Sequence, residues 1–346
     1  MRARRSVTVV VVALVALVAG CRGGGAGGDG LRDGEAIRLG YVPDALNAPA
    51  VVGIEKGMFA EALGGEDKLR TTVLKTGSSA VNRLLTGALD VAYVGPLSAI
   101  EAYERTNADG IRVVAGSTSG GNSLVVRPDI RSVDDLRDTT IATPPRGETQ
   151  AIALRAFLLD NGIATTPQGG GDVSVVAHAS AETLELFRAG EIDGAWLAEP
   201  WSSRLVLEGG GVVLVDELAL WPDEQFPTAV LVARTAFVRE HADALERLLE
   251  GHVRAVTEAE ENPAEAERVV QGAIRTHTGV AVSDAVLSTA WDSLLFTYDP
   301  IASGIRKTAD DAIRLASLRQ VDLSRLFDLT LLNRVLANSG QEEVGS

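Results

Sequence analysis

The sequence has very little cysteine, few aromatic residues and fewer basic than acidic side chains. Its 346 residues include one cysteine, Cys21, which excludes an intrachain disulfide and a cysteine-based metal cluster. Phe, Trp and Tyr make up only 4% of the chain, too few for a platform that stacks nucleic-acid bases. The 32 basic residues face 47 acidic ones, and the net charge of −15 repels a phosphate backbone. We therefore expect no nucleic-acid partner.

Residue patterns of catalysis and of metal binding are also missing from the sequence. The four histidines have no metal-ligand spacing (His178, His241, His252 and His277). Neither a G-x-S-x-G nucleophile elbow nor a Walker lysine loop occurs. The sequence therefore predicts no cofactor and no metal, and it favours a binding protein over an enzyme.

The N-terminus contains an apolar run of thirteen residues, 7–19, behind a basic head that includes Arg4-Arg5. This run suits a signal peptide and is shorter than the roughly 20 residues of a membrane span. The sequence Val18-Ala19-Gly20-Cys21 is similar to a bacterial lipobox, which predicts cleavage after residue 20 and a lipid on Cys21. The alternative is an uncleaved anchor with a bystander cysteine, and the export route, general or twin-arginine, stays open.

A glycine-rich tether is expected at residues 21–35, because six of the eight residues 23–30 are glycine. With a lipid on Cys21, such a tether would hold the protein at the extracytoplasmic face of the cell membrane.

The rest of the chain contains two halves of similar design, and its length allows about two domains. TGALDVAYVGP (86–96) aligns with AGEIDGAWLAE (189–199) at an offset of 103 residues. The alignment matches Gly87 with Gly190, Asp90 with Asp193, Ala92 with Ala195, and Tyr93 with Trp196. Each segment follows a helical pattern and leads into a strand pattern, which predicts two α/β lobes.

The chain is expected to cross between the lobes twice. Small residues at 117–121 suggest the first crossing, and Phe226-Pro227-Thr228 suggests the return. We therefore assign 36–118 to lobe 1, 119–227 to lobe 2, and 228–340 to the returning segment and C-terminal helices of lobe 1.

A binding site is expected where strands end and helices begin, at the carboxyl edges of the two sheets. Several helix N-termini at one cleft favour an anion, whereas Glu199 would repel a bare anion. Each candidate also has a purely structural alternative to ligand binding. The serines and threonines could cap helices, the arginine could lie in a solvated loop, the glutamate could make structural hydrogen bonds, and the aromatic residues could pack in the core. The candidate residues are Tyr41, Asn47, Ser78, Ser98, Ser117, Asn122, Arg146, Thr149, Glu199, Trp201 and Thr228.

Several of these segments resemble one known family. The chain is similar to the extracytoplasmic substrate-binding proteins of ABC importers, in the nitrate, sulfonate and taurine group that is also called NMT1-like. The similarity lies in NAPAVVGIEKGMFAEALG (47–64), LLTGALDVAYVGP (84–96), residues 127–163, LFRAGEIDGAWLAEPWSSRLV (186–206) and ENPAEA (261–266). One departure is Asp138-Thr139, where the family commonly has Gly-Lys.

The resemblance implies an α/β, two-lobed, periplasmic-binding-protein-like type II fold with a two-stranded hinge that closes on a ligand. It implies a monomer that delivers its solute to ABC permease subunits driven by a separate ATPase. Nitrate, bicarbonate, sulfonates, taurine and pyrimidine precursors all remain open as ligands, with an anion or zwitterion favoured. Carried over from the family, the site candidates are Ser98, Asn122, Thr149, Glu199 and Trp201.

Two other functions stay open beside import. One is a lipid-anchored sensor on the same fold. The other is a binder, or a synthase-like enzyme, of a thiamine pyrimidine precursor. The cysteine-rich tract that such family members often carry is absent here, which counts against the synthase.

Overall fold

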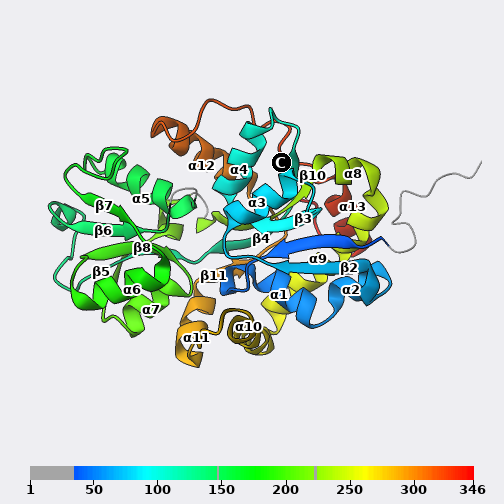
Figure 1. The fold of residues 1–346 in the computed structure, drawn as a ribbon, viewed down its shortest axis with the longest axis horizontal. Helices are drawn as coiled ribbons and strands as arrows, with labels where there is room; N and C mark the ends of the chain where they lie inside the picture. Colours follow the sequence, from blue (N-terminus) through cyan, green and yellow to red (C-terminus); the bar gives the residue numbers. More distant parts are fainter. Residues whose placement is uncertain (1–34, 146–147, 222–223) are drawn as a thin grey trace, which may run out of the picture.

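The computed structural model of the chain describes residues 35–145, 148–221 and 224–346. The predicted signal peptide, Cys21, the tether up to residue 34, and Arg146 lie outside the described residues. Two separate β-sheets, each covered by helices, form two lobes that lie side by side (Figure 1).

Lobe 1 is built on a six-stranded sheet of order β11-β4-β10-β3-β1-β2. Strands β1, β2 and β3 run parallel, and β10 is antiparallel to both β3 and β4. Strand β3 is buried throughout, as expected for an apolar run inside a sheet covered on both faces. The strands are β1 (Ile37–Tyr41), β2 (Leu69–Val73), β3 (Val91–Val94), β4 (Ile111–Gly120), β10 (Pro227–Arg234) and β11 (Leu294–Phe296).

Helices from both ends of the chain cover this sheet. α9 packs against α1 and α2, and its apolar stripe contributes Leu245, Leu248 and Leu249 to the core. The helices of lobe 1 are α1 (Ala48–Glu55), α2 (Met58–Leu63), α3 (Gly77–Leu85), α4 (Pro96–Arg105), α8 (Thr235–Glu240), α9 (Ala242–Glu261), α10 (Pro263–Thr278), α11 (Asp284–Asp292), α12 (Ala302–Arg314) and α13 (Thr330–Asn338), with short 3₁₀ turns η1 (Ala45–Asn47) and η2 (Glu66–Lys68).

Lobe 2 is built on a five-stranded sheet of order β7-β6-β8-β5-β9, in which β6 pairs in parallel with β7 and β8. The strands are β5 (Asn122–Val126), β6 (Thr140–Thr143), β7 (Ser174–Ala177), β8 (Gly194–Ala198) and β9 (Val212–Asp216). The helices are α5 (Thr149–Asp160), α6 (Ser180–Ala189) and α7 (Trp201–Leu207), with turns η3 (Asp134–Leu136) and η4 (Glu217–Leu220).

The aspartate repeated between the two halves performs the same task in each lobe. Asp90 precedes β3 and accepts hydrogen bonds from the Arg38 amide (3.0 Å) and guanidinium (2.8 Å) on β1. Asp193 precedes β8 and accepts from the Thr140 amide on β6 (2.7 Å). Each carboxylate therefore joins two neighbouring parallel strands at the start of a strand, the Asp90 carboxylate being buried and that of Asp193 partly buried.

The two crossings between the lobes lie beside each other. The first passes through Gly120 and Gly121, whose positive φ values of 80° and 75° are accessible to glycine at little cost. The Gly120 amide donates to the Phe226 carbonyl (3.3 Å), and the Thr228 hydroxyl donates to the Gly120 carbonyl (2.5 Å). A pair of hydrogen-bonded segments thus joins the lobes.

Two helices of the C-terminal segment also contact lobe 2. α11 packs against α7, and α12 packs against α5 (Figure 1). Arg314 at the end of α12 pairs with Asp160 at the end of α5. The lobes therefore meet on both sides of the crossings.

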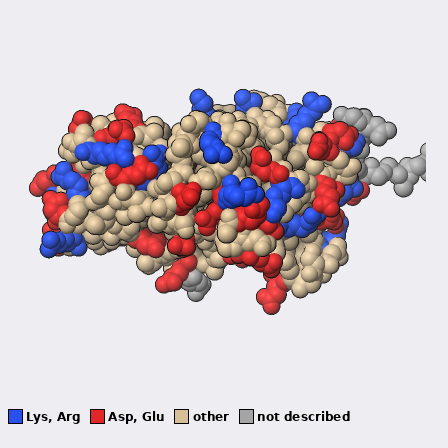
Figure 2. All heavy atoms as spheres, turned by 90° about the horizontal axis from the view of Figure 1, so that it is seen from below, with Lys and Arg blue, Asp and Glu red and all other residues tan. Residues whose placement is uncertain are grey.

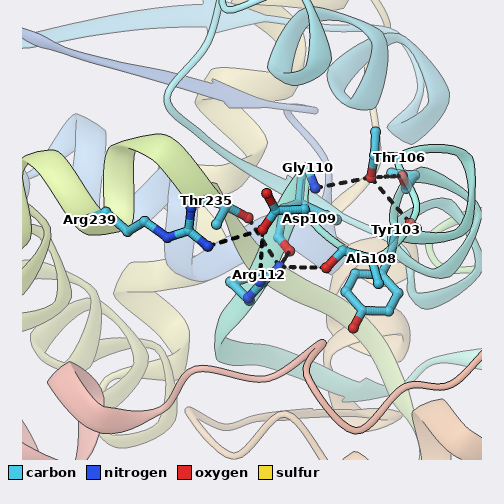
Figure 3. A network of polar contacts seen from close by, with 10 residues as sticks. Tyr103, Thr106, Ala108, Asp109, Gly110, Arg112, Thr235 and Arg239 are labelled. Atoms are coloured by element: carbon cyan, nitrogen blue, oxygen red, sulfur yellow. Dashed lines mark hydrogen bonds and ion pairs between the residues drawn. The ribbon is translucent and has the colours of Figure 1, made fainter.

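A polar network fixes the outer end of β4 in lobe 1. Asp109 accepts from Arg239 (3.0 Å), and the buried Arg112 donates to the Thr235 hydroxyl (3.1 Å) and the Ile111 carbonyl (2.7 Å) (Figure 3). Elsewhere on the surface, acidic and basic side chains lie close to one another (Figure 2). One such ion pair joins Arg254 and Glu61. These groups belong to the scaffold.

Candidate functional site

A cavity of about 420 Å³ lies between the two lobes. Lobe 1 lines it with the segments that follow β1, β2 and β3, and lobe 2 lines it with the segments that follow β6, β7 and β8. The cavity therefore sits at the carboxyl ends of parallel strands in both sheets, the position where ligands bind in open α/β sheets.

Six predicted site residues line this cavity, and they come from both lobes and both crossings. Thr228 is oriented by its hydrogen bond to Gly120, and Asn122 accepts a long bond from Gln150 (3.4 Å). The six are Asn47, Asn122, Thr149, Glu199, Trp201 and Thr228.

Four predicted residues do not line the cavity. Tyr41 is buried at the end of β1, with its ring edge-on to His277 at 6.5 Å. Ser117 lies inside β4, because the small-residue stretch predicted as a flexible crossing is strand up to Gly120. Ser98 is buried near Gly77, within 3.2 Å of the position a Cβ would take there.

Ser78 lies in the first turn of α3, but the cap of that helix is Thr76, whose hydroxyl accepts from the Ser79 amide (3.2 Å). The alternative role of a helix cap therefore does not apply to Ser78, which lies two residues after the cap and inside the helix. Thr76 and Gly77 reach the cavity in its place.

Glu199 holds the start of α7. It is buried, accepts from the Ser203 amide (3.1 Å), and lies 3.5 Å from the Ser293 hydroxyl at the end of α11. Burial raises the pKa of this carboxyl above its ordinary value, although the surrounding serine hydrogen bonds act in the opposite direction. Glu199 therefore links lobe 2 to α11 as well as facing the cavity.

Trp201 forms an apolar wall of the cavity. The Arg204 guanidinium lies 4.6 Å from the centre of its ring, and Arg204 also pairs with Glu208 (3.0 Å). Arg204 is therefore already neutralised, although it too lines the cavity.

Two cavity carboxyls were not among the predicted residues. Asp44 accepts from the Asn47 amide (3.0 Å) and side chain (2.8 Å), and burial raises its pKa to about 6. Glu148 precedes α5, and burial together with the charges of Asp44 and Glu101 raises its pKa to about 7. Both residues lie in segments expected to face the cleft, but the sequence carries no signal of their burial.

A buried pair supports the floor of the cavity. The Tyr93 hydroxyl lies 2.8 Å from His252 Nδ1, and His252 Nε2 lies 2.8 Å from the Gly116 carbonyl. Because the carbonyl only accepts, Nε2 carries the proton and Nδ1 accepts from Tyr93. Burial lowers the pKa of His252 to about 4, so the ring is neutral at physiological pH.

Neither a metal cluster nor a membrane span appears in the part of the chain that the structure describes. Within residues 35–145, 148–221 and 224–346 no three His, Cys, Asp or Glu side chains are grouped to hold a metal ion. Among the same residues no helix is long and apolar enough to cross a membrane.

Two lobes, two adjacent crossings and a cavity between strand ends define a type II periplasmic-binding-protein fold. Residues 32–274 match the model of the NMT1-like family, and the chain belongs to this family.

Known proteins agree with this assignment. A protein of Brucella abortus is 26% identical over 222 residues, which cover 63% of this chain and 65% of that relative's length. The aliphatic sulphonate-binding protein SsuA of Escherichia coli has a TM-score of 0.71 at 18% identity, covering 85% of this chain and 92% of its own. The nitrate-binding protein NrtA of Synechocystis has a TM-score of 0.72 at 14% identity, covering 88% and 89%. At these identities the two structures show the fold.

Proposed function

We propose that this protein is the solute-binding component of an ABC-type importer. It captures a small solute in the cavity between its lobes and delivers the solute unchanged to membrane permease subunits with a separate ATPase. The observation that carries the proposal is the cavity itself, which both lobes line at their strand ends while two adjacent segments connect them. The protein acts as a monomer, which light scattering would test.

The solute in this proposal is a small anionic or zwitterionic molecule of the nitrate, sulfonate and taurine class named above. Asp44, Glu148 and Glu199 all line the cavity, and they favour a zwitterion over a bare anion, since buried carboxylates repel negative charge.

The binding claim is tested by a thermal-shift panel on residues 22–346, a segment that contains every described strand and helix. The panel holds nitrate, bicarbonate, sulfonates, taurine and pyrimidines. A solute at 100 times its Kd should stabilise the protein by about 2.7 kcal/mol. Chromatography of the mixture should recover the solute unaltered. A melting temperature unmoved by every compound would overturn the solute list, and chemical conversion of a bound compound would overturn the transport role.

We also propose where in the cell this protein acts. We infer that the mature protein begins at Cys21 and is held at the extracytoplasmic face of the membrane by a lipid on that residue, as the lipobox-like sequence suggests. The variant Cys21→Ala should leave the membrane fraction and lose incorporation of labelled fatty acid. Membrane retention of this variant at wild-type level would contradict the anchor.

A further inference from the structure

Three hydroxyl groups that line the cavity are available to a ligand only as hydrogen-bond acceptors. The hydroxyl protons of three lining residues are already used within the protein: Tyr93 donates to His252, Thr228 to Gly120, and Thr278 to Ile274. Their oxygens face a ligand as acceptors only. A ligand that supplies hydrogen-bond donors would complement these groups.

The side chain of Asn47 also favours a ligand that supplies hydrogen-bond donors. Asn47 is 7% exposed and lines the cavity, and its amide nitrogen and backbone amide both donate to Asp44. Its side-chain oxygen has no hydrogen-bond partner among the described residues. A buried acceptor without a partner is costly, and a donor on a bound ligand would satisfy it.

Two acidic side chains, one from each lobe, line the same cavity as this acceptor. Asp44 follows β1 in lobe 1, and Glu148 precedes α5 in lobe 2. Both residues line the cavity, and the negative charge of Asp44 contributes to the raised pKa of Glu148. Among the residues that the structure describes, the basic side chains that line the cavity are Arg204, which is paired with Glu208, and Lys75, which is exposed.

We propose that the cavity recognises its solute through a protonated nitrogen group, an ammonium or amidinium on an apolar body, which Asp44 and Glu148 hold from opposite lobes while the Asn47 oxygen accepts one of its hydrogens. This inference rests on the proposed solute-binding function and names the chemical class of the solute. A cation between the two carboxylates replaces their repulsion by attraction to a shared charge, and this favours the closed arrangement of the lobes.

Affinity for such a solute depends on pH. Glu148 has a raised pKa of about 7 and faces Asp44 and Glu101. Between pH 6 and pH 8 its ionised fraction rises roughly tenfold, so affinity for a cation should rise by up to about tenfold over this range. The same binding event should release protons at pH 7.

Three probes of similar size and shape test the inference: benzylammonium, benzyl alcohol and benzenesulfonate. Calorimetric titration of residues 22–346 at pH 6 and pH 8 should show binding of benzylammonium, tighter at pH 8, and weaker or no binding of the other two. Tighter binding of benzenesulfonate would overturn the inference and leave the proposed function standing. Absence of benzylammonium binding at both pH values would also overturn it, while the wider solute panel judges the proposed function separately.

Variants identify the groups responsible. Glu148→Gln and Asp44→Asn should each weaken benzylammonium binding roughly tenfold or more, and Glu148→Gln should also flatten the pH dependence. The matched control is Glu191→Gln, which removes an exposed carboxyl of lobe 2 outside the cavity. Asp44 also orders the turn at Asn47, so Glu148→Gln is decisive if Asp44→Asn unfolds. Wild-type affinity in Glu148→Gln would overturn the inference.

Discussion

Replacing Glu217 by glutamine should stabilise the protein in alkaline solution. Glu217 is the first residue of η4, directly after β9; it is 1% exposed and accepts a hydrogen bond from Trp196 Nε1 (2.7 Å). Burial raises its pKa from 4.5 to about 7. A glutamine keeps an acceptor for Trp196 and removes the buried charge.

The sign and size of this change in stability follow from the coupling between folding and protonation of the carboxyl. The folded pKa lies above the unfolded one, so the contribution of Glu217 is fully present below the unfolded value and is lost as the pH rises through about 7. At 1.36 kcal/mol per tenfold change, Glu217→Gln should add about 3 kcal/mol to the free energy of unfolding at pH 8.5 and about 1 kcal/mol at pH 5.

Urea unfolding followed by tryptophan fluorescence measures this difference, because Trp196, Trp201 and Trp221 all lie in the lobe 2 segment. Glu191→Gln, at an exposed position, is the control and should change the stability by less than about 0.5 kcal/mol at either pH. An equal effect of Glu217→Gln at both pH values, or a loss of stability at pH 8.5, would refute the reasoning.

Three further predictions concern the scaffold and the site. The neutral His252 has a folded pKa of about 4, below its unfolded value, so its contribution to stability should fall by about 3 kcal/mol as the pH drops from 7 to 4. Urea titrations should show that His252→Gln removes this part of the pH dependence, and an unchanged slope would contradict the assignment. Gly116→Ala should lower the melting temperature sharply, since a Cβ there would lie 2.0 Å from the Asp299 carbonyl; a wild-type melting temperature would show that the backbone yields easily. Thr149→Ala and Trp201→Ala should each weaken binding of whichever panel solute stabilises the protein by roughly tenfold without unfolding it, and calorimetry giving unchanged affinity in both would remove them from the site.

The sequence was most informative where a residue's role depends on local strand and helix order. The repeat that contains Asp90 and Asp193 predicted two similar lobes, and both aspartates join neighbouring strands at equivalent positions. The strand-to-helix segments likewise predicted which loops would meet, because parallel strands present their carboxyl ends at one edge of a sheet.

The sequence was less informative about which side chains of a loop face the cavity. Tyr41 and Ser98 lie in segments expected to face the cleft, yet both are buried in the core of lobe 1. Asp44 and Glu148 occupy the same kinds of segment and do reach the cavity. Which side chains of these segments are buried and which reach the cavity depends on how the elements pack in three dimensions. A pattern of residue types along the chain does not encode that packing.

The central claim, that the lobes close around a solute, is tested most directly by a distance measured between them. Residues 22–346 contain no native cysteine, so spin labels can be placed on Thr276→Cys in α10 and Glu182→Cys in α6, both at exposed positions. Pulsed electron paramagnetic resonance should show a broad or longer interlobe distance without solute, and one shorter, narrower distance when a stabilising solute from the panel is added. An identical distribution with and without a solute that calorimetry shows to be bound would contradict the account.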